Sequence, residues 1–137
     1  MSAIGPGQGA MVKTVNQLLC GVHFAVVAEA FSLAAKVGVD PDLLLTILGK
    51  SSASSWMLKD RGPRMVQDDP VVTSAVDIFV KDLGIVLEAG TATRAALPLA
   101  AAAHQMFLAA SGHGLGAADD SQIVRAYAAL NGGPAKR

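Results

Sequence analysis

The stretch that decides the fold is residues 8–38, QGAMVKTVNQLLCGVHFAVVAEAFSLAAKVG. It is rich in alanine, leucine and valine, contains no proline, and has only Gly9 and Gly21 as weak points within it. Gly38, followed by an Asp-Pro step, is a plausible left-handed C-cap. We therefore predict one helix from about Gln8 to Lys36, roughly 40 Å long at 1.5 Å per residue.

Further helices are separated by capping signals and polar breaks. They are expected at 41–48, with Asp40 as N-cap; at 56–65, as a short helix or an irregular segment; from Ser74 or Ala75 to before Gly90; from Pro98 to near residues 112–114; and from Asp119 or Asp120 to Leu130. The helix before Gly90 carries Ile78, Phe79, Leu83, Val86 and Leu87, and the helix from Pro98 has Ala101, Met106, Phe107 and Ala110 as candidates for burial.

No alternating strand pattern of useful length is visible, and only 4% of residues are aromatic. The sequence therefore predicts an all-α protein, a single helical bundle built around the long N-terminal helix. We expect residues 8–131 to form this domain, with a leader or interdomain linker at 1–7 and a flexible tail at 132–137.

The composition excludes several classes of protein. Eleven basic residues balance eleven acidic ones, so no charge pattern indicates binding to nucleic acid or to an anionic membrane. The single cysteine, Cys20, excludes an internal disulfide framework and fits a reducing compartment. No secretory signal is visible, and Glu29 and Lys36 interrupt the apolar run before the ~18 residues that a membrane span needs. We expect a soluble, cytoplasmic protein.

Lys13 lies in the first turns of the long helix, and two amides follow it at Asn16 and Gln17. Residues three and four positions apart share a helical face, so the three side chains can converge. Donors near a helix N-terminus suit a small carboxylate or a developing alkoxide. The alternative to a binding site is a purely structural interpretation, in which Lys13 is a solvated surface lysine and Asn16 makes a helix–helix contact. His104 and His113 have no Cys, His or Asp partners at metal-ligand spacing, so no metal site is expected, and His23 is interpreted as a packed core or interface histidine.

Several motifs occur together in an order that resembles one family. They are Gly5-Pro6-Gly7-Gln8-Gly9 before Lys13 and Asn16-Gln17, Ala28-Glu29-Ala30, Lys81-Asp82-Leu83-Gly84, Pro98 at the head of a helix, and Gly114-Leu115-Gly116 before Asp119-Asp120-Ser121. Residues 5–131 thus resemble the C-terminal helical domain of the β-hydroxyacid dehydrogenases, which include 3-hydroxyisobutyrate dehydrogenase, tartronate semialdehyde reductase and 6-phosphogluconate dehydrogenase. Residues 55–57 and 74–82 are similar to the L-threonate dehydrogenase branch.

This resemblance implies a role for each matching residue. Lys13 would be the general acid/base that exchanges a proton with the substrate hydroxyl while hydride passes to NAD or NADP. Asn16 and Gln17 would hold the substrate, and Ser55 would lie near it. Lys81 and Phe79 would line the cofactor side of the cleft. Many family members carry Asn-Asn where this chain has Asn-Gln, which leaves the contact made by Gln17 open.

A dehydrogenase of this kind also needs a Rossmann domain, in which a strand precedes Gly-x-Gly-x-x-Gly and a helix. Residues 5–9 match this pattern only superficially, since no hydrophobic strand precedes them. We therefore expect a fragment that lacks the cofactor domain and is inactive alone. One hypothesis is the substrate-binding and dimerisation half of an NAD(P)-dependent hydroxyacid dehydrogenase acting on a sugar acid. The other is a non-catalytic helical interaction module. A homodimer is expected in either case, because the long helix is apolar around much of its circumference.

Overall fold

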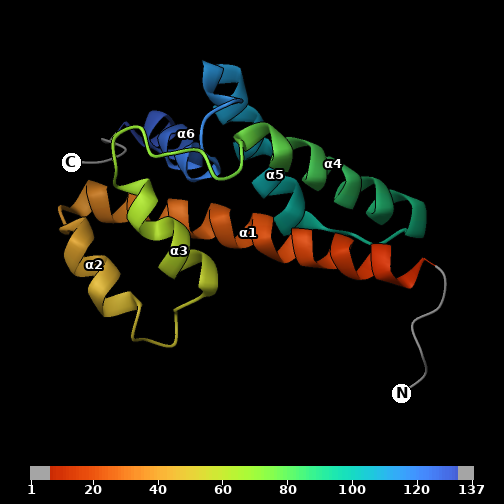
Figure 1. Ribbon diagram of the computed structural model, residues 1–137, viewed down its shortest axis with the longest axis horizontal. Coiled ribbons are helices and arrows are strands. Elements are labelled where there is room, and N and C mark those ends of the chain that lie inside the picture. The colour runs from red at the N-terminus through yellow and green to blue at the C-terminus, as the bar shows by residue number, and fades with distance from the viewer. Residues whose placement is uncertain (1–6, 133–137) are drawn as a thin grey trace.

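The structure, a computed structural model, describes residues 7–132, which form six α-helices and no strand (Figure 1). The helices are α1 (Gln8–Val37), α2 (Pro41–Leu48), α3 (Trp56–Met65), α4 (Val76–Thr93), α5 (Pro98–Ala110) and α6 (Ile123–Asn131), with a π-helical turn η1 (Ser111–Leu115) and a 3-10 turn η2 (Asp120–Gln122). The all-α prediction is confirmed. The expected leader and tail lie, apart from Gly7 and Gly132, outside the described residues.

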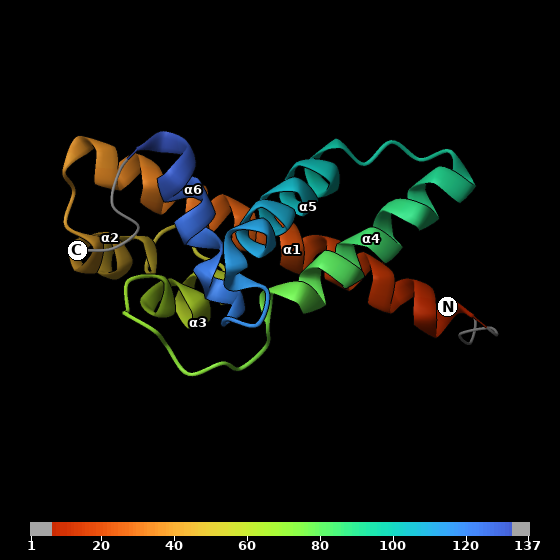
Figure 2. The same ribbon diagram turned by 90° about the horizontal axis from the view of Figure 1, so that it is seen from above.

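Helix α1 is the axis of the domain, and α3, α4, α5 and α6 all pack along its length (Figures 1 and 2). It ends as the sequence predicts: Gly38 adopts a left-handed φ of 79°, and its N–H donates to the carbonyls of Ala34 and Ala35. By length and composition α1 could also span a membrane, a test that core helices of soluble proteins pass as well. In this domain 44% of its most apolar window is buried.

Three phenylalanines from three helices form the centre of the core. The ring of Phe24 on α1 meets Phe79 on α4 edge-on at 5.0 Å and Phe107 on α5 at 5.9 Å, while Phe79 and Phe107 stack at 5.2 Å. Such offset and edge-to-face pairs each add about 1 kcal/mol to the burial of the rings. The cluster fixes α1, α4 and α5 relative to one another.

Helix α4 differs from the prediction in two respects. It continues through Gly90 to Thr93, and Arg94 rather than a glycine adopts the left-handed conformation at its end, with φ 58°. Gly90 is needed for packing instead, because a Cβ there would lie 2.7 Å from Cδ1 of Leu97 in the following connection. Ile78 is 43% exposed. The buried face follows the 3–4 spacing of positions 76, 79, 83 and 86, and Ile78 lies off that face.

Candidate active site

Four polar or polarisable side chains follow one face of the N-terminal half of α1. Since each residue turns the helix by about 100°, Lys13, Asn16, Gln17 and Cys20 lie within an arc of about 100°. Lys13 and Asn16 are exposed, whereas Gln17 and Cys20 are partly buried. The structure therefore brings together the three residues that the sequence singled out on α1, on an open surface of the domain.

The amides of this face are joined to α4 by a series of hydrogen bonds from Asn16 to Gln17 to Asp82, which we call the amide chain. Nε2 of Gln17 donates to Oδ2 of Asp82 at 2.8 Å, and Nδ2 of Asn16 donates to Oε1 of Gln17 at 3.1 Å and to Sγ of Cys20 at 3.5 Å. A carboxylate only accepts, so Asp82 fixes which end of the Gln17 amide faces it. The side-chain oxygen of Gln17 then faces Asn16, so Asn16 must donate a hydrogen bond from its amide nitrogen. The carbonyl oxygen of Asn16 is left as the acceptor that this face offers.

Helices α1 and α4 come close enough to form these hydrogen bonds because of Gly21 on α1. It lies one turn beyond Gln17, and a Cβ at this position would be 2.7 Å from Cδ2 of Leu83, the neighbour of Asp82. Leu83 is fully buried. A glycine on one helix therefore receives a leucine from the other, and the polar residues beside them reach hydrogen-bonding distance.

The two residues expected on the cofactor side both belong to α4 but lie in different environments. Lys81 is exposed and directly precedes Asp82 in the helix. Phe79 is 6% exposed and stacks on Phe107 in the aromatic core. Its ring supports the site from within the domain and does not line an open cleft in this structure.

Ser55 is the N-cap of α3, and its Oγ accepts a hydrogen bond from the N–H of Leu58 at 3.0 Å. The next residue, Trp56, contacts Arg61, whose guanidinium carbon is 5.7 Å from the Trp56 ring and 5.5 Å from the Phe24 ring. Arg61 thus lies where α3 crosses the face of α1, beyond Cys20. Ser55 itself has a structural role, and no contact between it and the amide chain is seen among the described residues.

Burial raises the pKa of the Cys20 thiol, and the hydrogen bond from Asn16 and the positive charge of Arg61 partly offset this effect. The contact of Arg61 with Phe24, one turn beyond Cys20 on α1, places its guanidinium near this end of the polar face. No local sequence signal points to Arg61, because its partner Asp120 is 59 positions away: Nε of Arg61 donates to Oδ1 of Asp120 at 3.0 Å. A second arginine on α3, Arg64, pairs with Asp119 in the same way.

The two aspartates of this network differ in their donors. Burial alone would raise the pKa of Asp119, but hydrogen bonds from Arg64, Ser121 and Thr73 outweigh it and hold this pKa well below its usual range. Asp120 is fully buried, and among residues 7–132 its side chain accepts hydrogen bonds only from Arg61; burial raises its pKa to about 6. From the sequence, Asp119 and Asp120 are interpreted as a helix cap. Asp119 does cap η2, accepting from Ser121 N–H, but together they also fasten α3 to the core.

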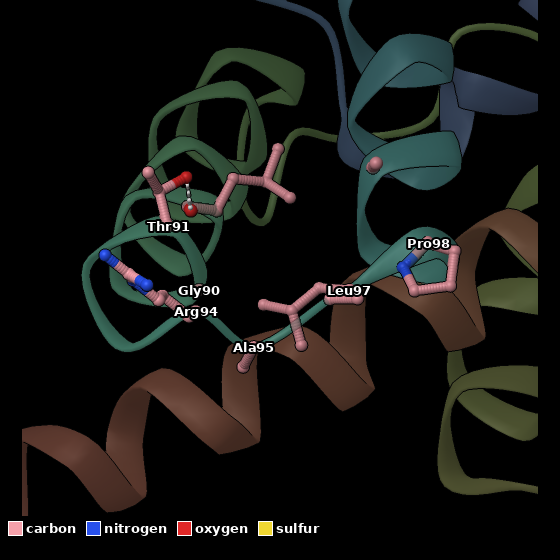
Figure 3. Close-up of a pocket in the computed structure, with 9 residues that line it drawn as sticks. Gly90, Thr91, Arg94, Ala95, Leu97 and Pro98 are labelled. Carbon is pink, nitrogen blue, oxygen red and sulfur yellow. Dashed lines mark hydrogen bonds between the residues drawn. The ribbon is translucent and has the colours of Figure 1, made fainter.

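An open pocket of about 550 Å³ lies away from these residues, between the end of α4 and the start of α5 (Figure 3). Gly90, Thr91, Arg94 and Leu97 are among the residues that line it, and none of the lining residues belongs to α1. The candidate catalytic and substrate-binding residues Lys13, Asn16 and Gln17 lie instead on the open face of α1. Within residues 7–132, no three His, Cys, Asp or Glu side chains lie close enough together to hold a metal ion.

Comparison with known proteins gives this geometry a context. Residues 7–127 match the family described as "NAD-binding of NADP-dependent 3-hydroxyisobutyrate dehydrogenase". The chain belongs to this β-hydroxyacid dehydrogenase family. Within the family its sequence falls with the L-threonate dehydrogenases: it is 49% identical to that of Cupriavidus necator over 121 residues and 42% identical to that of Escherichia coli K12 over 125.

These matches cover 88% and 91% of this chain but only 41% of each relative, so the chain spans about two fifths of their length. Among solved structures, 3-hydroxyisobutyrate dehydrogenase from Salmonella typhimurium superposes with a TM-score of 0.85 at 45% identity, over 88% of this chain and 42% of that one. The Mycobacterium tuberculosis enzyme with L-serine, at 24% identity and a TM-score of 0.75 over 87% and 43%, shares the fold.

Proposed function

We propose that this chain is the substrate-binding half of an NAD(P)-dependent dehydrogenase that oxidises a small hydroxy acid, a four-carbon sugar acid such as L-threonate. The observation that carries the proposal is the ordered polar face of α1, where Lys13 and Asn16 are exposed beside the amide chain to Asp82. The similarity to L-threonate dehydrogenases supports the substrate class.

Lys13 acts in this proposal as the general acid/base. Its neutral amine takes the proton of the substrate hydroxyl as the carbon–oxygen double bond forms, and the ammonium returns it in the reverse reaction. NAD or NADP, when bound, supplies the hydride acceptor. Lys13 is exposed on the isolated domain, as a group must be if it is to meet a substrate held between two domains.

Asn16 receives the substrate through its carbonyl oxygen. Because Asp82 and Gln17 direct the Asn16 amide nitrogen inward, the outward oxygen can accept a hydrogen bond from a substrate hydroxyl. A polyhydroxy acid offers several such hydroxyls. Gln17 and Asp82 therefore serve as positioning residues in this proposal. The sequence left open which contact Gln17 makes, and here Gln17 binds Asp82 and not the substrate.

The described residues fit only part of a dinucleotide site. Such a site requires a strand, a glycine-rich turn and a helix, and residues 7–132 contain no strand. Lys81, exposed on α4 and adjacent in sequence to Asp82, is the residue that would hold the cofactor from this side. The remaining contacts belong in this proposal to a cofactor domain that precedes α1. We place the enzyme in the cytoplasm.

Replacing Lys13 with Ala in an enzyme that joins this chain to its cofactor domain tests the acid/base role. We expect kcat with L-threonate to fall about 10²–10⁴-fold, the usual loss of a general acid/base. Lys36→Ala, the same change near the other end of α1, serves as the matched control and should leave turnover close to wild type. Turnover of Lys13→Ala near the wild-type level would refute the assignment.

Asp82 is tested by a pair of variants. Asp82→Ala removes the acceptor that orients Gln17, and a hydrogen bond to a charged group contributes about 1.5–3 kcal/mol. We expect kcat/KM to fall roughly 10- to 100-fold, mainly through KM. Asp82→Asn keeps one oxygen for Gln17 and should recover most of the activity. Equal losses in both variants would contradict the positioning role.

The second candidate function is a non-catalytic helical interaction module that keeps the fold. The amide chain argues against a non-catalytic module, because helix packing alone requires no exposed lysine beside ordered amides. The coding sequence immediately upstream discriminates between the two. A Gly-x-Gly-x-x-Gly segment between a strand and a helix would support the enzyme, and its absence would favour the module.

We also propose that the protein forms a homodimer. Six apolar side chains of α1 are at least half exposed, and monomeric proteins rarely leave such a continuous apolar surface uncovered. Sedimentation of the chain as a monomer at micromolar concentration would contradict this.

A further inference from the structure

The side-chain amide of Asn16 has both of its N–H groups occupied within the domain. Its nitrogen Nδ2 donates to Oε1 of Gln17 at 3.1 Å and to Sγ of Cys20 at 3.5 Å. A primary amide has two N–H donors on its nitrogen and an oxygen that only accepts. The two bonds therefore use the whole donor capacity of this side chain, and its oxygen is the group left to bind a substrate.

Both acceptors of this amide are held in place by the fold. Gln17 is fixed from α4, because its own amide donates to Oδ2 of Asp82 at 2.8 Å. Cys20 is partly buried and packs against the hydrophobic core, one turn beyond Asn16 on α1. The four-residue step places the thiol beside the amide on the same face of the helix. If the Asn16 amide turned over, its oxygen would face the oxygen of Gln17 and both bonds would be lost.

Cys20 also has a simpler interpretation, as a small apolar side chain that fills space beside the core. That interpretation explains its burial, but it does not account for a thiol that accepts a hydrogen bond from an amide of the polar face. The bond has a consequence that can be measured. Burial raises the pKa of the Cys20 thiol, whereas the hydrogen bond from Asn16 and the charge of Arg61 lower it. The thiol therefore reports on the state of the amide.

We propose that Cys20 is a positioning residue that makes Asn16 selective for a hydroxyl donor on the substrate. This inference rests on the proposed function and names the chemistry that its site selects. A substrate hydroxyl can donate to the Asn16 oxygen. A methyl group at the same place offers no donor, and a carboxylate offers only acceptors, so either would leave this oxygen unpaired. The site therefore prefers a polyhydroxy acid to a deoxy acid or a diacid of the same length.

The size of this preference follows from the cost of an unpaired acceptor. Asn16 is exposed on the isolated domain, and it loses water when a substrate lies between this face and a cofactor domain. Leaving one polar group unsatisfied in a site without water lowers kcat/KM by roughly 5- to 150-fold. We define the selectivity as kcat/KM for L-threonate divided by kcat/KM for an analogue that lacks one of the hydroxyls that are not oxidised.

Cys20→Ala and Cys20→Ser form a matched pair of variants, because alanine and serine are close in size and differ by the hydroxyl. In Cys20→Ala the second N–H of Asn16 is free to face the substrate, so the selectivity should fall about 5-fold or more. In Cys20→Ser the hydroxyl accepts this N–H in place of the thiol, and the selectivity should stay within about 2-fold of wild type. Both are measured in the enzyme that joins this chain to its cofactor domain.

A second measurement needs no turnover and uses the 137-residue chain. Because Cys20 is the only cysteine, the pH dependence of its alkylation by iodoacetamide gives the pKa of this thiol. Asn16→Leu removes the donor with little change in side-chain size, and it should raise the thiol pKa above that of the wild-type chain. The control is Thr14→Ala, which removes a hydroxyl that donates to the carbonyl of Ala10, and it should leave the thiol pKa unchanged.

Two results would overturn the inference. Equal changes of selectivity in Cys20→Ala and Cys20→Ser would show that the cysteine acts through packing alone. A thiol pKa that is the same in Asn16→Leu and in the wild-type chain would show that the bond to Asn16 is not formed. Failure of the proposed function is a separate result, seen as full turnover in Lys13→Ala or as no turnover of L-threonate by the wild-type enzyme. Neither of these affects the thiol titration, so the two failures can be told apart.

Discussion

The close approach of α1 and α4 at Gly21 makes a quantitative prediction about the site. In Gly21→Ala the new Cβ would lie 2.7, 2.8 and 3.0 Å from three side-chain carbons of Leu83. Carbon atoms prefer about 3.5–4.0 Å, so the helices or the leucine must shift by about 1 Å. Overpacking of this kind costs about 1–3 kcal/mol, against a gain of up to ~1 kcal/mol from replacing a helical glycine.

The matched control is Gly9→Ala on the same helix. Nothing lies within 4 Å of a Cβ built at Gly9, so this variant has only the helical gain. We expect the free energy of unfolding from urea denaturation to be lower in Gly21→Ala than in Gly9→Ala by about 1–3 kcal/mol. Leu83→Val, which shortens the obstructing side chain, should reduce the penalty in the double variant and give a measurable coupling energy.

The same shift should reach the amide chain. The bond from Gln17 to Asp82 is 2.8 Å, and a separation of about 1 Å would lengthen it beyond hydrogen-bonding distance. In the enzyme joined to its cofactor domain, Gly21→Ala should therefore raise KM while Gly9→Ala does not. A Gly21→Ala variant as stable as Gly9→Ala, with unchanged KM, would refute the role of this contact.

Three further predictions concern α3 and its ionic network. Ser55→Ala should cost about 0.5–2 kcal/mol of stability through loss of the N-cap, without a change in KM; a large change in KM would instead indicate the substrate contact. Asp120→Ala leaves Arg61 without its buried partner and should cost about 3–5 kcal/mol, whereas R61M/D120L should cost clearly less in thermal melts; equal losses would contradict the pairing. The pKa of Asp119 is lowered on folding, so its contribution to stability is present above its unfolded pKa of about 3.9 and is lost as pH falls from there through the lower folded pKa. Asp119→Asn should accordingly flatten the acid side of the stability–pH profile, and an unaltered profile would count against the assignment.

The helices could be predicted because their signals are local. Gly38 and Asp40 fix the end of α1 and the start of α2 by backbone conformation and capping, and both act within about four residues. The prediction that α4 ends before Gly90 was wrong for the same reason. Interpreted locally it indicates a helix end, but its actual role is to admit Leu97 from beyond the helix, a contact that no local pattern records.

The candidate site could be predicted on one helix but not across helices. Lys13, Asn16 and Gln17 share a face of α1 by spacing alone. The bond from Gln17 to Asp82 joins residues 65 positions apart, and that from Arg61 to Asp120 spans 59. Neither follows from spacing, because each depends on where two helices cross. The position of Phe79 in the core likewise depends on Phe24 and Phe107.

The three faces of α1 explain why its sequence is apolar yet interrupted. One face, with Gly21 and Phe24, is buried against α4 and the aromatic core. A second carries Lys13 and the amides, whose orientation is fixed from α4 and not from α1 itself. The third carries exposed apolar side chains, among them Val12, Leu19, Val26 and Leu33. Because one rigid helix carries all three, a shift of α1 against α4 would move the polar face together with the buried one.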